Sequence, residues 1–268
     1  MDVKEQDPMI PTRSEIELLA RQAGAILRHG YGRRHKVNKK GIIDLVTEVD
    51  HQSEAFLIGE IKRRYPDHRI LAEESGGQTG DQCCKWYIDP LDGTVNYAHS
   101  VPFFAVSLAL EVEGELQLGV VYDPMRDECF SAEAGRGAWL NGYPIHVSAT
   151  EDLLNSLLVT GFPYDIRENP DNNLDHYNRL WLRTQGVSRL GSATLDISYV
   201  ACGRLDGFWE LRLGAWDVAA ALLIAREAGA LVSDIHGGPD YFPVVKSILV
   251  ANPVLHPQIS AVLSGRDG

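Results

Sequence analysis

The stretch from residue 103 to residue 132 restricts the possible folds more than any other part of the chain. Apolar segments of strand length follow one another there, separated by the turn-forming pairs Glu113-Gly114 and Asp123-Pro124. Connections this short join neighbouring antiparallel strands, because parallel strands need a long crossover. The stretch therefore predicts an antiparallel, meander-like sheet.

Helical and strand patterns lie on both sides of this meander. Before it, apolar spacing predicts helices over residues 14–29 and 49–65, and strands over 69–72 and 86–88. After Gly142 we expect strands at 157–160, 187–190, 206–211, 231–234 and 248–251, and helices at 174–184, 191–202 and 217–228. These patterns predict two closely packed halves, each with a sheet and helices, at residues 1–150 and 151–268.

Composition excludes several classes of protein. The 268-residue chain carries a net charge of -12, which argues against direct nucleic-acid contact. Its four cysteines form no CxxC pair, so we expect a reduced, cytoplasmic protein. The N-terminal sequence MDVKEQDPMIPTRSE lacks the apolar core of a signal peptide, and no apolar run is long enough for a membrane span.

Two carboxylates close to the end of the predicted strand 86–88 need an explanation. Asp89 and Asp92 are followed by Gly93 and Thr94, and a turn accounts for these residues equally well when they are taken alone. A helix that begins near Gly93 would, however, direct free N–H groups at a phosphate. The carboxylates would repel that phosphate unless metal ions lay between them. With the Leu91 carbonyl they form an all-oxygen set, which suits Mg²⁺.

Other candidate residues also have ordinary structural explanations when each is considered alone. Glu73 and Glu74 could form a solvated acidic loop, and Asp217 could cap a helix. Thr47 and Asp50 resemble a capping box in which aspartate replaces the usual glutamate. These residues occur, however, at successive element boundaries in one chain, and the combination is more specific than any member of it.

The segments EES (73–75), DPLDGT (89–94) and WDVAA (216–220) resemble the inositol monophosphatase family of Mg²⁺-dependent, lithium-sensitive phosphatases. The resemblance extends from about residue 18 to residue 252, and TGFPYD (160–165) is similar to the bacterial branch. It implies an α+β fold, a layered αβαβα sandwich of the sugar-phosphatase type, and a homodimer. Ala221 and Ala230 stand where many members have glycine.

The resemblance also implies roles for individual residues. Glu73, Asp89 and the Leu91 carbonyl would hold one Mg²⁺, Asp89, Asp92 and Asp217 a second, and Glu73 with Glu74 a looser third. Thr94 would contact the attacking water, Asp50 would accept the threonine proton, and Thr47 would lie nearby. The N–H groups of Gly93 and Thr94 would bind phosphate, and Gly191, Ser192, Ala193 and Glu210 would contact substrate hydroxyls. Lys39 would lie near a mobile metal loop.

This set of residues predicts a phosphatase for small phosphate monoesters that uses a metal-activated water. The sequence leaves the ester open: inositol 1-phosphate or a similar polyol or sugar phosphate is favoured, with fructose 1,6-bisphosphate, histidinol phosphate and a nucleotide 3′-phosphate as alternatives. A haloacid-dehalogenase-type phosphatase has the similar motif DxDGT, but its aspartates are two residues apart, whereas Asp89 and Asp92 are three apart. A regulatory, non-catalytic role is a further alternative.

Overall fold

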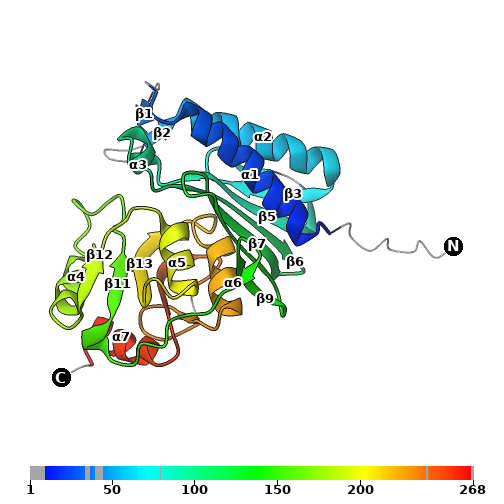
Figure 1. Ribbon diagram of the computed structural model, residues 1–268. Coiled ribbons are helices and arrows are strands. Elements are labelled where there is room, and N and C mark those ends of the chain that lie inside the picture. The colour runs from blue at the N-terminus through cyan, green and yellow to red at the C-terminus, as the bar shows by residue number, and fades with distance from the viewer. Residues whose placement is uncertain (1–9, 34–36, 40–44, 79, 240, 267–268) are drawn as a thin grey trace.

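The computed structural model of the protein describes residues 10–33, 37–39, 45–78, 80–239 and 241–266. Within these residues the chain forms an eight-stranded sheet, a five-stranded sheet and a small antiparallel pair, β1 (Val37–Lys39) and β2 (Leu45–Thr47). Figure 1 shows the two large sheets with helices outside and between them. None of the described helices has the length and apolar character that crossing a membrane requires.

The eight-stranded sheet contains the predicted meander. Its order is β10-β9-β8-β7-β6-β5-β3-β4, with β3 at His68–Ala72, β4 at Gly76–Gln78, β5 at Asp81–Asp92, β6 at Ala105–Val112, β7 at Glu115–Asp123, β8 at Glu128–Glu133, β9 at Gly137–Leu140 and β10 at Tyr143–Pro144. Strands β6, β7 and β8 pair antiparallel, as the turn pairs predict. Glu113 and Gly114 both have positive φ, 54° and 85°, which a tight two-residue hairpin requires.

The five-stranded sheet is mixed, in the order β12-β11-β13-β15-β14. Its strands are β11 (Leu157–Thr160), β12 (Gly186–Ser188), β13 (Gly207–Leu213), β14 (Leu231–Ser233) and β15 (Val245–Ala251). Strand β11 pairs parallel with β12 and β13, whereas β15 pairs antiparallel with β13 and β14. A short 3-10 helix at Leu153–Asn155 precedes this sheet, and the proposed division at residue 150 stays a prediction.

Helices complete five layers around these two sheets. Helices α1 (Arg13–Gly30) and α2 (Glu48–Arg64) cover the outer face of the eight-stranded sheet, and α5 (Ala193–Ala201) and α6 (Ala219–Glu227) lie between the sheets. Helices α4 (Leu174–Trp181) and α7 (Leu255–Leu263) pack on the far side of the five-stranded sheet. The predicted α+β, layered αβαβα fold is confirmed.

The central helix α6 explains how the two sheets share one core. Every residue from 219 to 225 is buried, because the helix has a sheet on each side and its sequence is apolar all round. Gly119 on β7 allows the close approach: a Cβ at this position would lie 2.7 Å from the Ala220 carbonyl oxygen. Only a glycine lets the helix backbone rest on the strand here.

Several element boundaries differ from those that the sequence predicts. Strand β5 is longer than residues 86–88 and continues through both aspartates, with a register shift between Asp89 and Asp92. The helix predicted to begin at Asp217 begins at Ala219, and the one predicted to end at Thr184 ends at Trp181. Helix α7 was not predicted from the sequence, and it contains Pro257. This proline occupies the first turn, where its missing N–H costs no helical bond.

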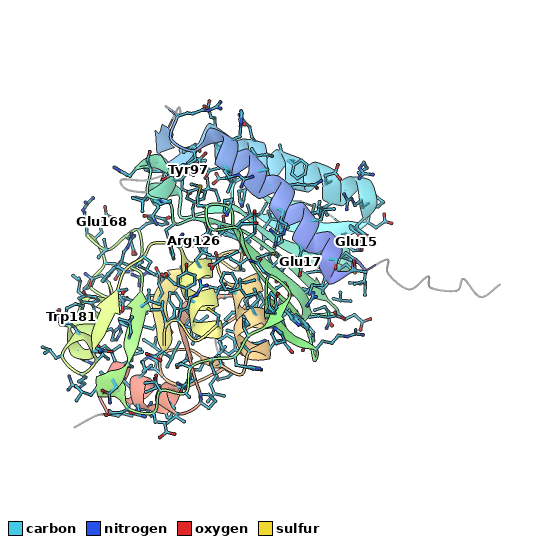
Figure 2. All side chains as sticks on the ribbon, viewed as in Figure 1. Glu15, Glu17, Tyr97, Arg126, Glu168 and Trp181 are labelled. Atoms are coloured by element: carbon cyan, nitrogen blue, oxygen red, sulfur yellow. The ribbon has the colours of Figure 1, made fainter. Side chains whose placement is uncertain are left out.

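The short helix α3 (Thr94–Ala98) is anchored to the N-terminal layer. Its Tyr97 is buried, lies below α1 in Figure 2, and donates a hydrogen bond from its hydroxyl to the Leu27 carbonyl at 2.8 Å. Its ring packs edge-on against Phe104. This contact holds α3, and the residues immediately before it, in a defined position relative to the eight-stranded sheet.

Candidate active site

A cleft of about 350 Å³ lies between the part of the chain that forms the eight-stranded sheet, here called the N-terminal half, and the part that forms the five-stranded sheet, the C-terminal half. The N-terminal half contributes Glu73, Asp92, Gly93, Thr94 and Val95. The C-terminal half contributes 161–164, Arg189, 191–193, Asp196, Glu210, 212–214, Trp216 and Asp217. The cleft therefore brings most of the predicted metal, phosphate and hydroxyl contacts together, although they are far apart in the sequence.

The turn at Gly93 directs the chain from β5 into α3. Gly93 has a φ of 95°, in the left-handed region, and a Cβ at this position would lie 3.0 Å from the Phe103 carbonyl oxygen. Both the backbone conformation and the close contact require glycine. As predicted, the helix begins at the next residue, Thr94, whose side chain lines the cleft.

Behind the cleft, Thr94 belongs to a buried chain of hydrogen bonds. Its hydroxyl lies 3.1 Å from Asp50 Oδ1 and 3.0 Å from the Leu91 carbonyl oxygen, both of which can accept its proton. Asp50 Oδ2 accepts bonds from the Thr47 backbone N–H at 2.9 Å and the Thr47 hydroxyl at 2.5 Å. Burial raises the pKa of Asp50, and these hydrogen bonds oppose that rise. The Thr47–Asp50 capping box is therefore present, and it orients a carboxylate toward Thr94.

Asp92 connects the two halves. Its Oδ2 accepts hydrogen bonds from the Ser192 hydroxyl at 2.6 Å, the Thr194 N–H at 2.8 Å and the Thr194 hydroxyl at 2.5 Å. Sequence reasoning assigned Asp92 to a metal and Ser192 to substrate, and did not identify Thr194. Burial raises the pKa of Asp92, and the bonds from these hydroxyls and from the helix backbone oppose that effect.

The remaining carboxylates lie close enough to repel one another. Asp89 is buried beneath the cleft and accepts a hydrogen bond from the Leu91 N–H at 3.0 Å. Burial, and then the charges of Glu73, Asp92 and Asp217, raise the pKa of Asp89 well above its usual value. Burial and the charges of Glu73 and Asp92 do the same to the pKa of Asp217, whose Oδ2 accepts the Gly214 N–H at 2.6 Å.

Carboxylate oxygens are the ligands that a hard cation prefers, but these side chains do not converge on one point in the described part of the chain. Within the described residues, no group of three or more histidine, cysteine, aspartate or glutamate side chains converges closely enough to hold a metal ion as it stands. Carboxylates at short range repel one another, and Ser192 and Thr194 engage one Asp92 oxygen. Burial and the charges of Glu73 and Asp92 nevertheless raise the pKa of Asp89 and of Asp217, and a divalent cation among these carboxylates would relieve their repulsion.

The C-terminal half contributes two further acidic side chains to the cleft, Glu210 and Asp196, and the sequence predicted only Glu210. Burial, and then the charge of Asp92, raise the pKa of Glu210 to about 8, with Arg189 opposing the shift. The Glu210 carboxylate packs against Gly161, where any Cβ would overlap it. Asp196 and Arg189 also line the cleft but were not predicted. The only local signal for Asp196 is its place in the first turn of α5, after the GSAT segment.

Besides Thr47, Asp50 and Asp89, the predicted residues Leu91 and Glu74 do not line the cleft wall. The Leu91 carbonyl lies beneath it, next to Thr94. The Glu74 N–H donates a hydrogen bond to Glu54 Oε2 at 2.9 Å, which holds this residue toward α2. Lys39 ends β1, but its side chain lies outside the described residues, so its predicted place near a metal loop stays a prediction.

The raised pKa of Glu210 predicts how the stability of the metal-free protein depends on pH. Between the ordinary value of 4.5 and about 8, the folded state holds a proton that the unfolded state has released. The free energy of unfolding in chelator should therefore fall as pH rises from 5 to 8. Thermal melting should show a smaller fall for Glu210→Gln. The exposed Glu168→Gln should behave as the wild type, and an unchanged slope in Glu210→Gln would contradict the assignment.

Comparisons with known proteins identify the family and the fold. The model of the inositol monophosphatase family matches residues 10–266. The chain is 48% identical to the inositol-1-monophosphatase of Synechocystis sp., over 90% of this chain and 85% of the relative. It is 44% identical to the Nus factor SuhB of Escherichia coli, over 87% of this chain and 88% of that protein.

Solved structures give the same result. The inositol monophosphatase from Anabaena superposes with a TM-score of 0.85 at 44% identity, covering 94% of this chain and 95% of that one. The extragenic suppressor protein SuhB from Bartonella henselae gives a TM-score of 0.89 at 38% identity, covering 93% and 97%. Because sequence model, curated relatives and folded structures agree over nearly the whole chain, the protein belongs to the inositol monophosphatase family.

Proposed function

We propose that the protein is a Mg²⁺-dependent phosphomonoesterase that hydrolyses inositol 1-phosphate, or a similar polyol or sugar phosphate, with water as the nucleophile. The observation that carries this proposal is the position of the Thr94 hydroxyl. Thr94 lines the same cleft as Glu73, Asp92 and Asp217, and its hydroxyl is hydrogen-bonded to the buried Asp50. The relatives named inositol monophosphatases support the same reaction.

Residues of the N-terminal half bind phosphate and water, and residues of the C-terminal half bind the leaving alcohol. The N–H groups of Gly93 and Thr94 bind the phosphate group of the ester. Thr94 orients a water molecule and accepts its proton, while the proton of the Thr94 hydroxyl passes to Asp50. Thr47 holds Asp50 in place. Gly191, Ser192, Ala193 and Glu210 bind hydroxyls of the leaving alcohol. No serine, cysteine or histidine nucleophile is needed.

The acidic residues Glu73, Asp89, Asp92 and Asp217, with the Leu91 carbonyl, would hold Mg²⁺, and Glu74 would assist a looser ion. When bound, Mg²⁺ supplies an acidified water and offsets negative charge on the phosphate. Asp92 has one oxygen engaged by Ser192 and Thr194, so it would bind through the other. A mechanism through a phospho-aspartate, as in haloacid-dehalogenase-type phosphatases, is not proposed, because the chain belongs to a different family.

A phosphate-release assay tests the proposed function directly. Purified protein should release phosphate from myo-inositol 1-phosphate with Mg²⁺, lose activity in excess chelator and be inhibited by Li⁺. Fructose 1,6-bisphosphate, histidinol phosphate and a nucleotide 3′-phosphate should be poorer substrates. Full activity in chelator would refute the metal requirement. Absence of activity on every ester would favour the alternative regulatory role, which the relatives named Nus factor SuhB support.

We further propose that the protein is a homodimer, on the basis of the family and of its 44% hydrophobic content. Light scattering of the purified protein should give about twice the mass of one chain. A mass close to that of one chain would refute this prediction. The acidic net charge of -12 supports the absence of direct nucleic-acid contact and is compatible with a cytoplasmic location.

A further inference from the structure

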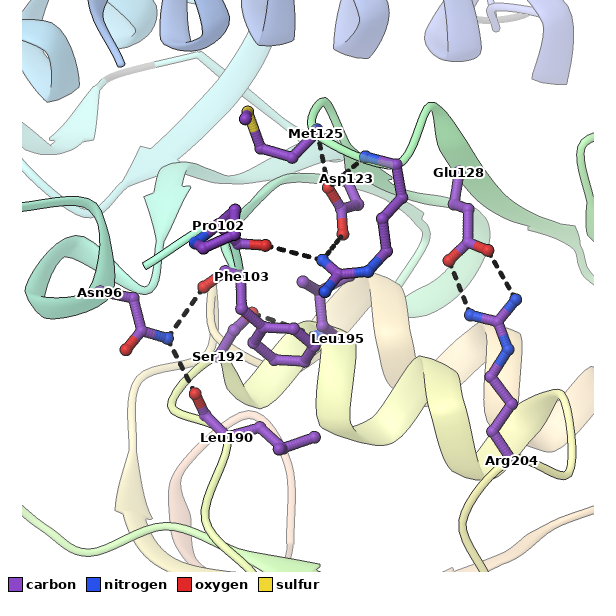
Figure 3. Close-up of polar contacts among 11 residues, drawn as sticks. Asn96, Pro102, Phe103, Asp123, Met125, Glu128, Leu190, Ser192, Leu195 and Arg204 are labelled. Carbon is purple, nitrogen blue, oxygen red and sulfur yellow. Dashed lines mark hydrogen bonds and ion pairs between the residues drawn. The ribbon is translucent and has the colours of Figure 1, made fainter. Parts of the chain in front are cut away.

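Asn96 makes a contact that none of the roles above uses. It lies on α3, two residues after Thr94, and is only 8% exposed. Its Nδ2 donates to the Phe103 carbonyl at 2.9 Å and to the Leu190 carbonyl at 2.8 Å, as Figure 3 shows. An amide nitrogen carries two hydrogens, so both bonds form at once. The Gly191 carbonyl lies 3.4 Å from the same nitrogen.

The two carbonyls come from the two halves of the chain that flank the cleft. Phe103 belongs to the N-terminal half, and its carbonyl packs on the Gly93 turn. Leu190 belongs to the C-terminal half and directly precedes Gly191, the first residue proposed to contact the leaving alcohol. A Cβ at Gly93 would lie 3.2 Å from the Gly191 carbonyl oxygen, so the two walls nearly touch here. The Asn96 side chain therefore connects the two halves at a place where they lie in close contact.

The charge pattern makes this bridge more important. Asp92 faces the cleft from the N-terminal half, and Asp196 and Glu210 face it from the C-terminal half. When Asp196 or Glu210 ionises, repulsion by Asp92 tends to separate the walls, and Arg189 opposes this effect. Ser192 and Thr194 counter this by binding Asp92, but they hold the beginning of α5. The bonds from Asn96 hold the residues before it, and a neutral amide does so without adding charge.

We propose that Asn96 is a positioning residue, which sets the distance between the phosphate-binding turn at Gly93–Thr94 and the alcohol-binding segment at Gly191–Ala193. This inference rests on the proposed function, and it assigns to Asn96 the alignment of the phosphate-binding and alcohol-binding subsites. A bound ester contacts both subsites, so its phosphorus is in line with the water only when their separation is correct. A displacement of about 1 Å can cost about 10²-fold in rate.

The test compares two esters with the Asn96→Ala variant in Mg²⁺. We expect kcat/KM for myo-inositol 1-phosphate to fall by about 10²-fold. For p-nitrophenyl phosphate, whose leaving group has no hydroxyls to contact residues 191–193, we expect a fall of less than about threefold. Inhibition by inorganic phosphate should not change, because phosphate has no alcohol group to contact residues 191–193. Asn96→Ser, which keeps one donor, should lie between wild type and Asn96→Ala.

A matched control removes a different bond between the halves. Arg204 pairs with Glu128 through two bonds of 2.6 and 2.5 Å outside the cleft, as Figure 3 also shows. Arg204→Gln should lower the melting temperature while leaving the ratio of the two kcat/KM values unchanged. Equal losses on both esters in Asn96→Ala, or a changed ratio in Arg204→Gln, would overturn the positioning role.

Hydrogen exchange provides a readout that does not require activity. Backbone amides of residues 190–193 should exchange faster in Asn96→Ala than in wild type, and should be unaffected in Arg204→Gln. If the wild type hydrolyses neither ester, the proposed function fails, and the exchange experiment still decides whether Asn96 holds the segment. Unchanged exchange in both Asn96 variants would overturn the inference by itself.

Discussion

Replacing Thr94 with alanine is expected to lower kcat by about 10²–10⁴-fold while KM changes little. Thr94 lines the cleft and its hydroxyl hydrogen-bonds to the buried Asp50, so the substitution removes a group that orients the water and passes on the water's proton. The substrate in its ground state loses little, because the backbone N–H groups of the turn remain. Steady-state kinetics on myo-inositol 1-phosphate with saturating Mg²⁺ measure both constants.

Thr184→Ala is the matched control for this experiment. Thr184 is also buried, and its hydroxyl donates to the Leu180 carbonyl at 2.9 Å, at the end of α4. It should lower the melting temperature without changing kcat. Thr94→Ser, which keeps the hydroxyl, should retain most of the activity. A raised KM with unchanged kcat in Thr94→Ala would make Thr94 a substrate-binding residue.

The second large effect is expected from Asp89→Asn, which should act on stability and activity in opposite directions. Asp89 is buried and repelled by Glu73, Asp92 and Asp217, while one backbone N–H bonds to its carboxylate. Asparagine keeps the shape and removes the charge. In chelator the variant should therefore be more stable than wild type, by about 1 kcal/mol or a rise of ~2–4 °C in melting temperature. Activity with Mg²⁺ should fall by about 10²-fold or more.

Thermal melting of wild type and variant, each in chelator and in Mg²⁺, separates the two effects. Mg²⁺ should stabilise the wild type by mass action, because the unfolded chain has no assembled site, and should stabilise Asp89→Asn far less. Asp206→Asn is the control: this buried carboxylate accepts the Leu157 N–H at 2.7 Å, and its loss should destabilise the protein under both conditions. A lower melting temperature of Asp89→Asn in chelator would show that Asp89 is structural.

The stabilising effect of Asp89→Asn and the catalytic effect of Thr94→Ala have a common origin. Both residues belong to locally unfavourable arrangements. Asp89 is a buried carboxylate close to other carboxylates, and the Thr94 hydroxyl bonds to the buried carboxylate of Asp50. Such arrangements lower the stability of the empty protein and are expected where binding of an ion and a substrate compensates for them.

The amino-acid sequence by itself determined the features that depend on near neighbours. The turn pair Glu113-Gly114 sets the antiparallel pairing, because its backbone conformation matches the twist of the strands it joins. The Thr47–Asp50 capping box and the helix that begins at Thr94 involve residues within one turn. Local spacing also predicted that Asp89 and Asp92 come at the end of an apolar strand, since that depends on consecutive residues alone.

Only the tertiary structure decided which residues meet across the cleft. Thr194 is 102 positions from the Asp92 that it binds, and Leu190 is 94 positions from Asn96. Neither contact leaves a local pattern, because each depends on how the two sheets pack against α5 and α6. The raised pKa of Glu210 likewise arises from burial and from Asp92, which belongs to the other half of the chain. Residue type and spacing can indicate a carboxylate's chemistry, but its charge state depends on the solvent and the neighbours that the completed fold places around it.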